Sequence, residues 1–390
     1  MISTQEALAE CLALAAPVGH EIVPLLHAGG RVLASTLTAT RDQPPFATSV
    51  MDGYALDGAR PGARYRVVGA APAGHAWPGT LQPGEALRIF TGAPIPKGAS
   101  QVVIQEDVTR SDDTITLADR LDAKANIRPP GTDFRIGSEI ASGRVLSPAL
   151  VALAAAMGHA DLTVSRRPDV AIMATGDELV PPGGTPRPDQ IVASNSYGLK
   201  AMADAAGANA RLLPIAADRK DSLETAFGLA RDADLVVTIG GASVGDHDIV
   251  GAVAADLGMA RSFYKIAMRP GKPLMAGKLS ASALLGLPGN PASAMVCGQI
   301  FMVPMIAAML GLPAGPAPRK QARLAVDIGA NGPREHYMRA TLDGDALTPA
   351  DSQDSALLTR LAAANVLLVR PPNAPACRAG DTVDYVPLIA

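Results

Sequence analysis

The chain has 390 residues and a formal net charge of −3, and only 3% of its residues are aromatic. This length exceeds one compact core and predicts roughly two to four domains. The charge argues against a general nucleic-acid coat, which carries a basic excess, and the aromatic content argues against a base-stacking platform. Cys11, Cys297 and Cys377 show no metal-ligand spacing, and no basic and apolar leader opens the chain, so we expect a cytoplasmic protein.

Two predicted helices bracket a segment of different composition in the first half of the chain. The first helix begins at Ser3, which can form a capping box with Glu6, and the second begins at Ser147-Pro148. Between them the chain is rich in glycine and proline, with short β-type runs at 65–68, 87–90, 101–105 and 114–117. We therefore expect a helical linking domain, residues 1–43 and 134–168, interrupted by a β-rich domain at 44–133.

From residue 169 onward strands and helices alternate, which predicts βαβ units and a mostly parallel sheet within residues 169–313. The expected strands cover 170–175, 211–216, 235–240, 263–268 and 283–287. The expected helices cover 194–206, a segment opened by a capping box of Asp221 and Glu224, and a segment capped by Asn290 before Pro291.

The last of these helices lies in the most apolar stretch of the chain, residues 291–310. Gln299 and Pro304 interrupt this stretch. Because a membrane span needs about twenty nearly unbroken apolar residues, we expect a buried helix and no membrane span. A proline-rich linker follows, and short β-type runs then predict a small β domain at 318–390.

Loops that follow the apolar strands carry the polar and charged residues that could bind a ligand or take part in catalysis. The carboxyl ends of parallel strands meet at one edge of a sheet, so these loops predict one site. The glycine-rich loop from Gly240 exposes backbone N–H groups of Gly241, Ser243 and Gly245 that can bind an anion. Glu178 and Asp248 could hold a hard cation such as Mg²⁺ beside that anion. Any single carboxylate is equally consistent with a helix cap or a solvent-facing side chain.

Positive charge at the same edge comes from Lys265, Arg269 and Lys272. Pro270-Gly271 excludes a helix, and in an extended chain Lys265 and Arg269 point to the same side. Three converging cations suit a pyrophosphate or another oxyanion, whereas separately they would form an ordinary solvated loop. The stiff turn from Pro288 to Pro291 presents a helix N-terminus that suits a small anion or serves only as a turn.

The β-rich region adds polar residues on turns marked by glycine and proline. They are Ser49, Asp52, Thr91 and Glu106, together with Arg128 and Asp133 from the segment 126–137. Such loops often carry function. The sequence contains no HExxH, Walker A or GxGxxG motif, so the hypotheses of a metalloprotease, a P-loop protein and a dinucleotide-binding protein lose their strongest support.

Seven motifs occur in a fixed order along the chain: SVMDGYA, TGAPIPKGA, NIRPPGTDFRIG, TGDEL, GGASVGDHD, KIAMRPGKP and GLPGNPAS. Together they resemble the MoeA family of molybdopterin molybdenumtransferases, which is related to the E domain of gephyrin. The resemblance covers nearly the whole chain. It implies a helical segment, an inserted β domain, a MogA-like three-layer α/β domain and a C-terminal β-barrel.

The resemblance also implies the reaction. Molybdate joins adenylylated molybdopterin, the pyrophosphate link is cleaved with the help of Mg²⁺, and AMP is released. The protein would be a homodimer whose active cleft is shared between subunits, with a contact to the MogA-type adenylyltransferase that makes its substrate. No nucleic acid or membrane is implied.

The motifs and the resemblance together define the candidate residues. The catalytic set is Asp52, Thr91, Glu178, Asp218 and Asp248. The substrate-binding set is Arg128, Asp133, Gly241, Ser243, Gly245, Lys265, Arg269, Lys272, Pro288 and Pro291. Glu178 and Asp248 are the expected magnesium ligands. Arg269 stands where lysine is common, the SQDS turn departs from the usual pattern and leaves Ser355 without a role, and His247 matches no motif.

Two alternatives remain open from the sequence. The first is the preceding step, adenylylation of molybdopterin by ATP, although stand-alone adenylyltransferases of this kind consist of the α/β domain alone. The second is a binding scaffold like gephyrin, with the fold but without turnover. Retention of Asp52, Glu178, Asp248 and the three cations argues against it.

Overall fold

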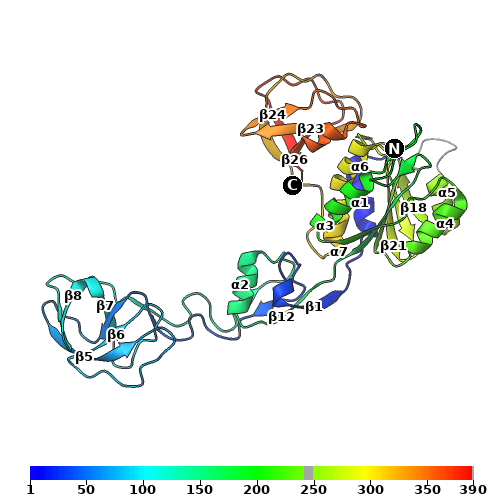
Figure 1. The fold of residues 1–390 in the computed structure, drawn as a ribbon. Helices are drawn as coiled ribbons and strands as arrows, with labels where there is room; N and C mark the ends of the chain where they lie inside the picture. Colours follow the sequence, from blue (N-terminus) through cyan, green and yellow to red (C-terminus); the bar gives the residue numbers. More distant parts are fainter. Residues whose placement is uncertain (241–248, 389–390) are drawn as a thin grey trace. The chain divides into compact units, whose positions relative to one another are not determined.

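The computed structural model describes residues 1–240 and 249–388, and the chain divides into two compact units (Figure 1). Unit 1 comprises residues 1–21, 30–34 and 163–390, and unit 2 comprises residues 22–29 and 35–162. The chain passes between the units along two paired strands, β1 (His20–Pro24) and β12 (Asp161–Ser165).

Unit 2 is built around a six-stranded sheet, as the β-rich composition predicted. Its spatial order is β7-β4-β6-β5-β9-β8. The strands are β4 (Gly53–Leu56), β5 (Arg64–Ala71), β6 (Glu85–Ile89), β7 (Gln101–Ile104), β8 (Val108–Ser111) and β9 (Thr114–Leu117). Alternate residues enter different clusters: Tyr54 and Leu56 pack in one, and Ala55 packs with Leu87 in another. This alternation follows from the two-residue period of a strand.

The remainder of unit 2 connects to this sheet through short elements. Helix α2 (Pro148–Ala156) begins as predicted, with the Ser147 hydroxyl accepting from the N–H of Leu150 and proline in the first turn. Strand β2 (Leu37–Thr38) pairs with β11 (Glu139–Ile140), and β3 (Thr48–Ser49) pairs with β10 (Ile127–Arg128). Two 3-10 turns complete this unit, η1 (Leu25–His27) and η2 (Gln105–Asp107).

The centre of unit 1 is a three-layer α/β domain with a mostly parallel sheet, which confirms the predicted fold class. Its spatial order is β16-β13-β17-β21-β20-β18, and β20 runs antiparallel to both of its neighbours. The strands are β13 (Asp169–Ala174), β16 (Asn209–Leu212), β17 (Leu235–Ile239), β18 (Ala260–Tyr264), β20 (Met275–Leu279) and β21 (Ser282–Leu287).

Helices cover both faces of this sheet (Figure 1). One face packs against α1 (Thr4–Leu14), α3 (Asn195–Ala205) and a continuous helix formed by α6 (Pro291–Cys297), the π-helical η3 (Gly298–Met302) and α7 (Val303–Met309). The other face packs against α4 (Lys220–Leu229) and α5 (Ile249–Asp256). Val170 and Ile172 point to the first face and Ala171 and Met173 to the second, so β13 is buried on both sides.

The helix from Pro291 to Met309 is long and apolar enough to cross a membrane by length and composition. Within the protein, however, 78% of its most apolar window is buried. Ile300, Phe301 and Met305 pack in the same cluster as α1 and α3. The prediction of a buried core helix is therefore confirmed. The capping box of Ser3 and Glu6 at the start of α1 is confirmed as well.

Several predicted boundaries in the α/β domain are wrong. The strand expected at 211–216 is β16 and ends at Leu212, because Pro214 has no N–H to continue a ladder. The strand expected at 263–268 ends at Tyr264, where Lys265 takes a left-handed φ of 72°. Helix α4 begins at Lys220 with Arg219 at the N-cap, so Asp221 lies inside its first turn rather than capping it. Strand β20 was not predicted.

The C-terminal domain is a closed five-stranded barrel. The ladder runs β23-β24-β22-β26-β25, and pairing of β25 with β23 closes it. The elements are β22 (Lys320–Leu324), β23 (Glu335–Asp343), β24 (Ala346–Pro349), β25 (Val366–Arg370), β26 (Thr382–Pro387) and the short helix α8 (Leu358–Ala362). Strand β19 (Met268–Arg269), from the α/β domain, pairs in parallel with β23 and brings the RPGK loop to the barrel.

Candidate active site

A cavity of 590 Å³ opens at the carboxyl edge of the α/β sheet. Its walls include the residues that follow β13, β17 and β21, and the beginning of α3. Four predicted residues line it: Glu178, Asp218, Pro288 and Pro291. Among the described residues these separate loops line one cavity, and their role as one site stays a prediction. Open α/β sheets bind ligands at this edge because the loops and helix N-termini converge there.

One wall of the cavity is acidic. The backbone after β13 is held by hydrogen bonds from the N–H of Thr175 to the carbonyl of Ile239 (2.9 Å) and from the N–H of Gly176 to the carbonyl of Ala216 (3.1 Å). A short parallel ladder of β14 (Leu179–Val180) and β15 (Ile191–Val192) supports the same turn. Glycine is favoured at 176 because its φ of 149° is a backbone conformation that other residues rarely adopt.

Asp218 approaches this turn from the segment before α4. Its N–H donates to Oδ1 of Asp177 at 3.2 Å. Burial raises the pKa of the Asp218 carboxyl, and the negative charges of Asp177 and Glu178 raise that pKa further. Three carboxylates on two neighbouring loops therefore repel one another. A cation placed among them would remove this repulsion.

The opposite wall is formed by the turn after β21 and by α3. The side-chain amide of Asn195 donates to the carbonyl of Gly289 at 2.7 Å, which fixes the turn. Asn290 occupies the N-cap position of α6, but it makes no side-chain cap, so the predicted capping bond is wrong. Its Nδ2 donates instead to Oγ of Ser355 at 3.0 Å. The N–H of Ala292 donates to the carbonyl of Ser355, also at 3.0 Å.

The barrel therefore contributes to the rim of the cavity through the segment 353–356. Ala356 lines the cavity beside the Pro288–Pro291 turn. Ser355, for which no role was predicted, joins that turn to the barrel. The turn is thus held from two sides, by Asn195 and by Ser355.

The three predicted cations have different surroundings, and their convergence stays a prediction. The Lys265 ammonium lies 4.9 Å from the centre of the Tyr264 ring. Arg269 is exposed in β19, opposite His336 of the barrel, and Lys272 is also exposed. The positive φ of Lys265 interrupts the extended chain on which the shared side of Lys265 and Arg269 was predicted. Pro273, which follows Lys272 in the chain, lines the cavity.

A buried arginine that the sequence did not single out lies next to Arg269. The Arg339 side chain, in β23, is 1% exposed, and none of its three guanidinium nitrogens has a hydrogen-bond partner among the described residues. Gln353 fixes its backbone through two hydrogen bonds of 2.9 Å. Burial lowers the pKa of Arg339, the carboxylate of Asp354 opposes that effect, and Arg269 reinforces it.

The surroundings of Arg339 are strongly basic. Burial lowers the pKa of His336 to about 4, and the charges of Arg269, Arg339, Arg334 and Arg370 contribute to that depression. A buried charge without acceptors is costly, and an anion would supply the acceptors that Arg339 lacks among the described residues. The sequence signal was an arginine within the apolar run of a strand, which carries meaning only once its burial is known.

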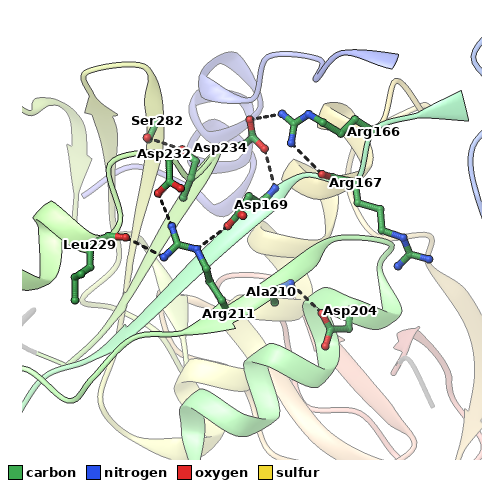
Figure 2. A network of polar contacts seen from close by, with 11 residues as sticks. Arg166, Arg167, Asp169, Asp204, Ala210, Arg211, Leu229, Asp232, Asp234 and Ser282 are labelled. Carbon is green, nitrogen blue, oxygen red and sulfur yellow. Dashed lines mark hydrogen bonds and ion pairs between the residues drawn. The ribbon is translucent and has the colours of Figure 1, made fainter. Parts of the chain in front are cut away.

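A contrasting network lies at the amino ends of β13, β16 and β17 in the α/β sheet, where Arg211 and Arg166 are paired with carboxylates (Figure 2). Arg211 donates to Asp169 at 3.0 Å, to Asp232 at 2.7 Å and to the carbonyl of Leu229 at 2.9 Å. Arg166 donates to Asp234 at 2.8 Å, and Asp234 also accepts from the N–H of Asp169 at 2.7 Å. This network joins the amino ends of neighbouring strands. Because Arg211 and Arg166 already have acceptors, it does not indicate a ligand-binding site.

Unit 2 brings together another part of the predicted set. Oδ1 of Asp52 accepts hydrogen bonds from the N–H and from Oγ1 of Thr91, each at 2.8 Å. These two bonds, the backbone one first, lower the pKa of Asp52, so the carboxylate is ionised at neutral pH. Arg88 adds a smaller effect in the same direction and lies over the rings of Phe90 and Tyr54, at 4.7 and 5.2 Å from their centres.

Arg128 lies on a segment linked to that of Thr91, and Asp133 lies on a segment bonded to Gln43. Arg128 is paired with Thr48 in the β3–β10 ladder, and Thr48 in turn bridges to Pro94, close after Thr91. The N–H of Asp133 donates to the carbonyl of Gln43 at 2.9 Å. Both side chains are exposed. Asp52, Thr91 and Arg128 therefore come from three adjacent segments of one unit.

Part of the predicted site lies outside the described residues. Gly241, Ser243, Gly245, Asp248 and His247 all belong to the segment 241–248. Within residues 1–240 and 249–388, no group of three or more His, Cys, Asp or Glu side chains is placed to hold a metal ion. Magnesium is commonly held by one or two carboxylates together with substrate phosphates, so Glu178 and Asp218 fit its usual demands.

Sequence models of three family regions match the chain in order. The MoeA N-terminal region (domains I and II) matches residues 2–158, a probable molybdopterin-binding domain matches 171–308, and the MoeA C-terminal region (domain IV) matches 321–388. A molybdopterin molybdenumtransferase of Nostoc sp. is 36% identical over 369 residues, covering 90% of this chain and 85% of its own. The chain belongs to the MoeA family.

Further comparisons agree with this membership. Molybdopterin molybdenumtransferase 2 of Mycobacterium tuberculosis is 35% identical over 360 residues, which is 88% of each chain. The crystal structure of the molybdopterin biosynthesis MoeA protein from Pyrococcus horikoshii superposes with a TM-score of 0.86 at 28% identity, over 100% of both chains. The MoeA fold expected from the seven motifs is thereby confirmed, including the closed barrel.

Proposed function

We propose that this protein is a molybdopterin molybdenumtransferase of molybdenum cofactor biosynthesis. Its substrates would be molybdate and adenylylated molybdopterin. The two dithiolene sulfurs would bind molybdenum as their protons leave with one molybdate oxygen as water, and hydrolysis of the pyrophosphate link would release AMP. Support comes from membership of the MoeA family, whose curated relatives carry this activity in their names, and from the chemistry of the cavity rim.

The observation that carries the proposal is the guanidinium of Arg339, which is unpaired among the described residues and whose backbone is held by Gln353, two residues before Ser355. A tetrahedral dianion offers the hydrogen-bond acceptors that this buried charge lacks. Ser355 and Pro273 connect the same region to the cavity. Because the guanidinium nitrogens are closed to solvent, direct contact with molybdate requires a local side-chain movement, and the exposed Arg269 is the neighbour that can give way.

The acidic wall would serve the pyrophosphate. Glu178 and Asp218 would hold Mg²⁺, with Asp248 as the further ligand predicted from the sequence. The ion would supply charge neutralisation and polarisation of the phosphoryl group. The protein's own residues then divide the remaining work: Asn195 and Ser355 hold the Pro288–Pro291 turn in place, and Gly176 lets Glu178 face the cavity.

Asp52 would act from a second copy of the chain. In the proposed homodimer, the surface of Asp52, Thr91 and Arg128 meets the cavity of the partner's α/β domain. The ionised Asp52, held by Thr91, can position the substrate or accept a proton. The protein would act in the cytoplasm and receive its substrate from a MogA-type adenylyltransferase.

Molybdate-dependent release of AMP from adenylylated molybdopterin, with and without Mg²⁺, tests the proposal. The expected result is release that needs both molybdate and the metal. Formation of adenylylated molybdopterin from ATP and molybdopterin would instead support the adenylyltransferase reading. A well-folded protein that binds the substrate but releases no AMP under any of these conditions would support the scaffold reading.

A further inference from the structure

A row of basic side chains crosses the first part of strand β23 in the C-terminal barrel. His336 of β23 is the ladder partner of Arg269 in the parallel strand β19 and of Arg370 in the antiparallel strand β25. Ladder partners carry their side chains on the same face of a sheet, with Cβ atoms about 4.5–5.5 Å apart in antiparallel pairs. Three strands therefore place Arg269, His336 and Arg370 side by side, and we call these three residues the basic row.

The basic row forms no ion pair with a carboxylate in the described part of the chain. The adjacent carboxylate, that of Glu335, is engaged elsewhere: it accepts from Arg319 at 2.7 Å and from the hydroxyl of Tyr337 at 3.2 Å. The charge of Asp354 acts on Arg339. Like charges directly opposite one another destabilise a sheet, so an anion bound to the row would be stabilising. The charged groups that act on the His336 ring are all arginines, namely Arg269, Arg334, Arg339 and Arg370.

Burial distinguishes the basic row from a solvated surface patch. His336 is 6% exposed and Arg370 is 3% exposed, whereas Arg269 is exposed and opens the row to solvent. Nη2 of Arg370 donates to the carbonyl of Pro375. The His336 ring has no hydrogen-bond partner among the described residues. A buried polar ring without a partner beside two guanidinium groups is the arrangement that an anion would complete.

His336 can change its charge, whereas the two arginines cannot. Burial, and after it the surrounding positive charges, lower the pKa of His336 to about 4, so the ring is neutral at pH 7 when no anion is bound. A dianion in the row would offset those positive charges and favour the protonated ring. Binding of the anion and binding of a proton to His336 therefore strengthen each other, because such coupling is reciprocal.

We propose that the basic row binds a tetrahedral oxyanion together with one proton, which His336 takes up. The two arginines supply fixed positive charge, and the protonated ring donates from both of its nitrogens. A tetrahedral oxyanion has acceptor oxygens in several directions, which suits donors that come from three strands. Only the identity of the anion as molybdate rests on the proposed function.

Calorimetry of sulfate binding to the full-length protein tests this proposal without turnover. Sulfate keeps both negative charges between about pH 5 and pH 8, so a change in affinity over that range comes from the protein. For the wild-type protein we expect the affinity to rise as the pH falls, approaching about tenfold per pH unit, because one proton is taken up with each anion. Titrations in two buffers of different ionisation enthalpy measure the number of protons taken up.

Three variants isolate the groups responsible. His336→Gln keeps a polar side chain but cannot gain a charge, and it is expected to lose the proton uptake and most of the pH dependence. Arg269→Gln changes an exposed residue, so folding is preserved, and it is expected to weaken sulfate binding about tenfold at every pH while proton uptake remains. His75→Gln removes an exposed histidine of unit 2, and it is the matched control that should behave as the wild-type protein.

The possible results separate clearly. Sulfate affinity that does not change with pH in the wild-type protein would overturn the proposal, and so would full proton uptake in His336→Gln. An Arg269→Gln variant that binds sulfate as tightly as the wild-type protein would also overturn it. Failure of the proposed function is distinct, because it would abolish molybdate-dependent AMP release and leave the uptake of a proton with sulfate unchanged.

Discussion

Replacement of Arg339 by methionine is expected to stabilise the ligand-free barrel while abolishing its response to molybdate. Methionine keeps much of the length of the side chain and removes a charge that is 1% exposed and has no partner in the described structure. Most arginine substitutions destabilise a protein because they break bonds. Here no side-chain bond is lost, and the desolvation penalty of the charge disappears.

The magnitude follows from the cost of burying an unpaired ion. That cost is several kcal/mol, and a cautious value of about 2 kcal/mol corresponds to a roughly 30-fold smaller opening equilibrium. Saturating molybdate at about 100 times its Kd would stabilise the wild-type protein by about 2.7 kcal/mol through binding linkage, and the variant by nothing. Ligand-free variant and molybdate-bound wild type should therefore be protected to a similar degree.

Hydrogen exchange read by mass spectrometry is the suitable assay, because unfolding of a chain of several domains is not a single transition. Amides of β23 and β25 report the barrel. Arg211→Met is the matched control: it removes three satisfied hydrogen bonds of a side chain that is 33% exposed, and is expected to destabilise β13 and β16 by about 1 kcal/mol. Faster exchange in Arg339→Met without molybdate, or an unchanged response to molybdate, would refute the reasoning.

Three further predictions concern the acidic wall, Asp52 and the rim. The pKa of Asp218 is raised in the folded protein, so ionisation of this carboxyl opposes folding as pH rises through that pKa, and a thermal-shift assay should show that Mg²⁺ stabilises the wild-type protein more at neutral than at acid pH. In Asp218→Asn this difference in stabilisation should shrink, and a product assay should show that Mg²⁺-dependent AMP release falls at least tenfold. Thr91→Val removes one of the two hydrogen bonds that lower the pKa of Asp52, so the acid limb of the pH–rate profile should move to higher pH. If the acid limb does not move, Asp52 is not the group that titrates there. Asn290→Ala loses the bond to Ser355, worth about 1 kcal/mol, and should raise the KM for molybdate with little change in kcat, whereas an unchanged KM would show that this bond does not support the rim.

Local features of the sequence were enough to predict most elements of the fold. Ser3 with Glu6, Ser147 with Pro148, and the doubly buried runs of β13 and β17 act over a few residues, and the structure confirms each of them. Errors arose where one residue overrides its neighbours' pattern. Pro214 ends β16 early. The left-handed φ of Lys265 interrupts the extended chain in which Lys265 and Arg269 were predicted to point to the same side.

The candidate site was only partly predictable for a different reason. Glu178, Asp218, Pro288 and Pro291 follow strand ends, and parallel strands bring such residues to one edge whatever the rest of the chain does. The barrel is different, because its position against the RPGK loop depends on pairing of β19 with β23, more than sixty residues apart in the chain. No local pattern specifies such a contact.

The sequence by itself therefore determined the order of the domains, the layers of the α/β unit and the edge at which the site lies, because strand period, helix caps and glycine turns are local physics. Only the tertiary structure decided which polar groups are left without partners. Arg211 and Arg339 look alike in the sequence, yet packing surrounds Arg211 with acceptors and buries Arg339 with no acceptor from the described residues. Burial and hydrogen bonding are properties of the folded neighbourhood, and they are what turn an arginine into a candidate ligand-binding group.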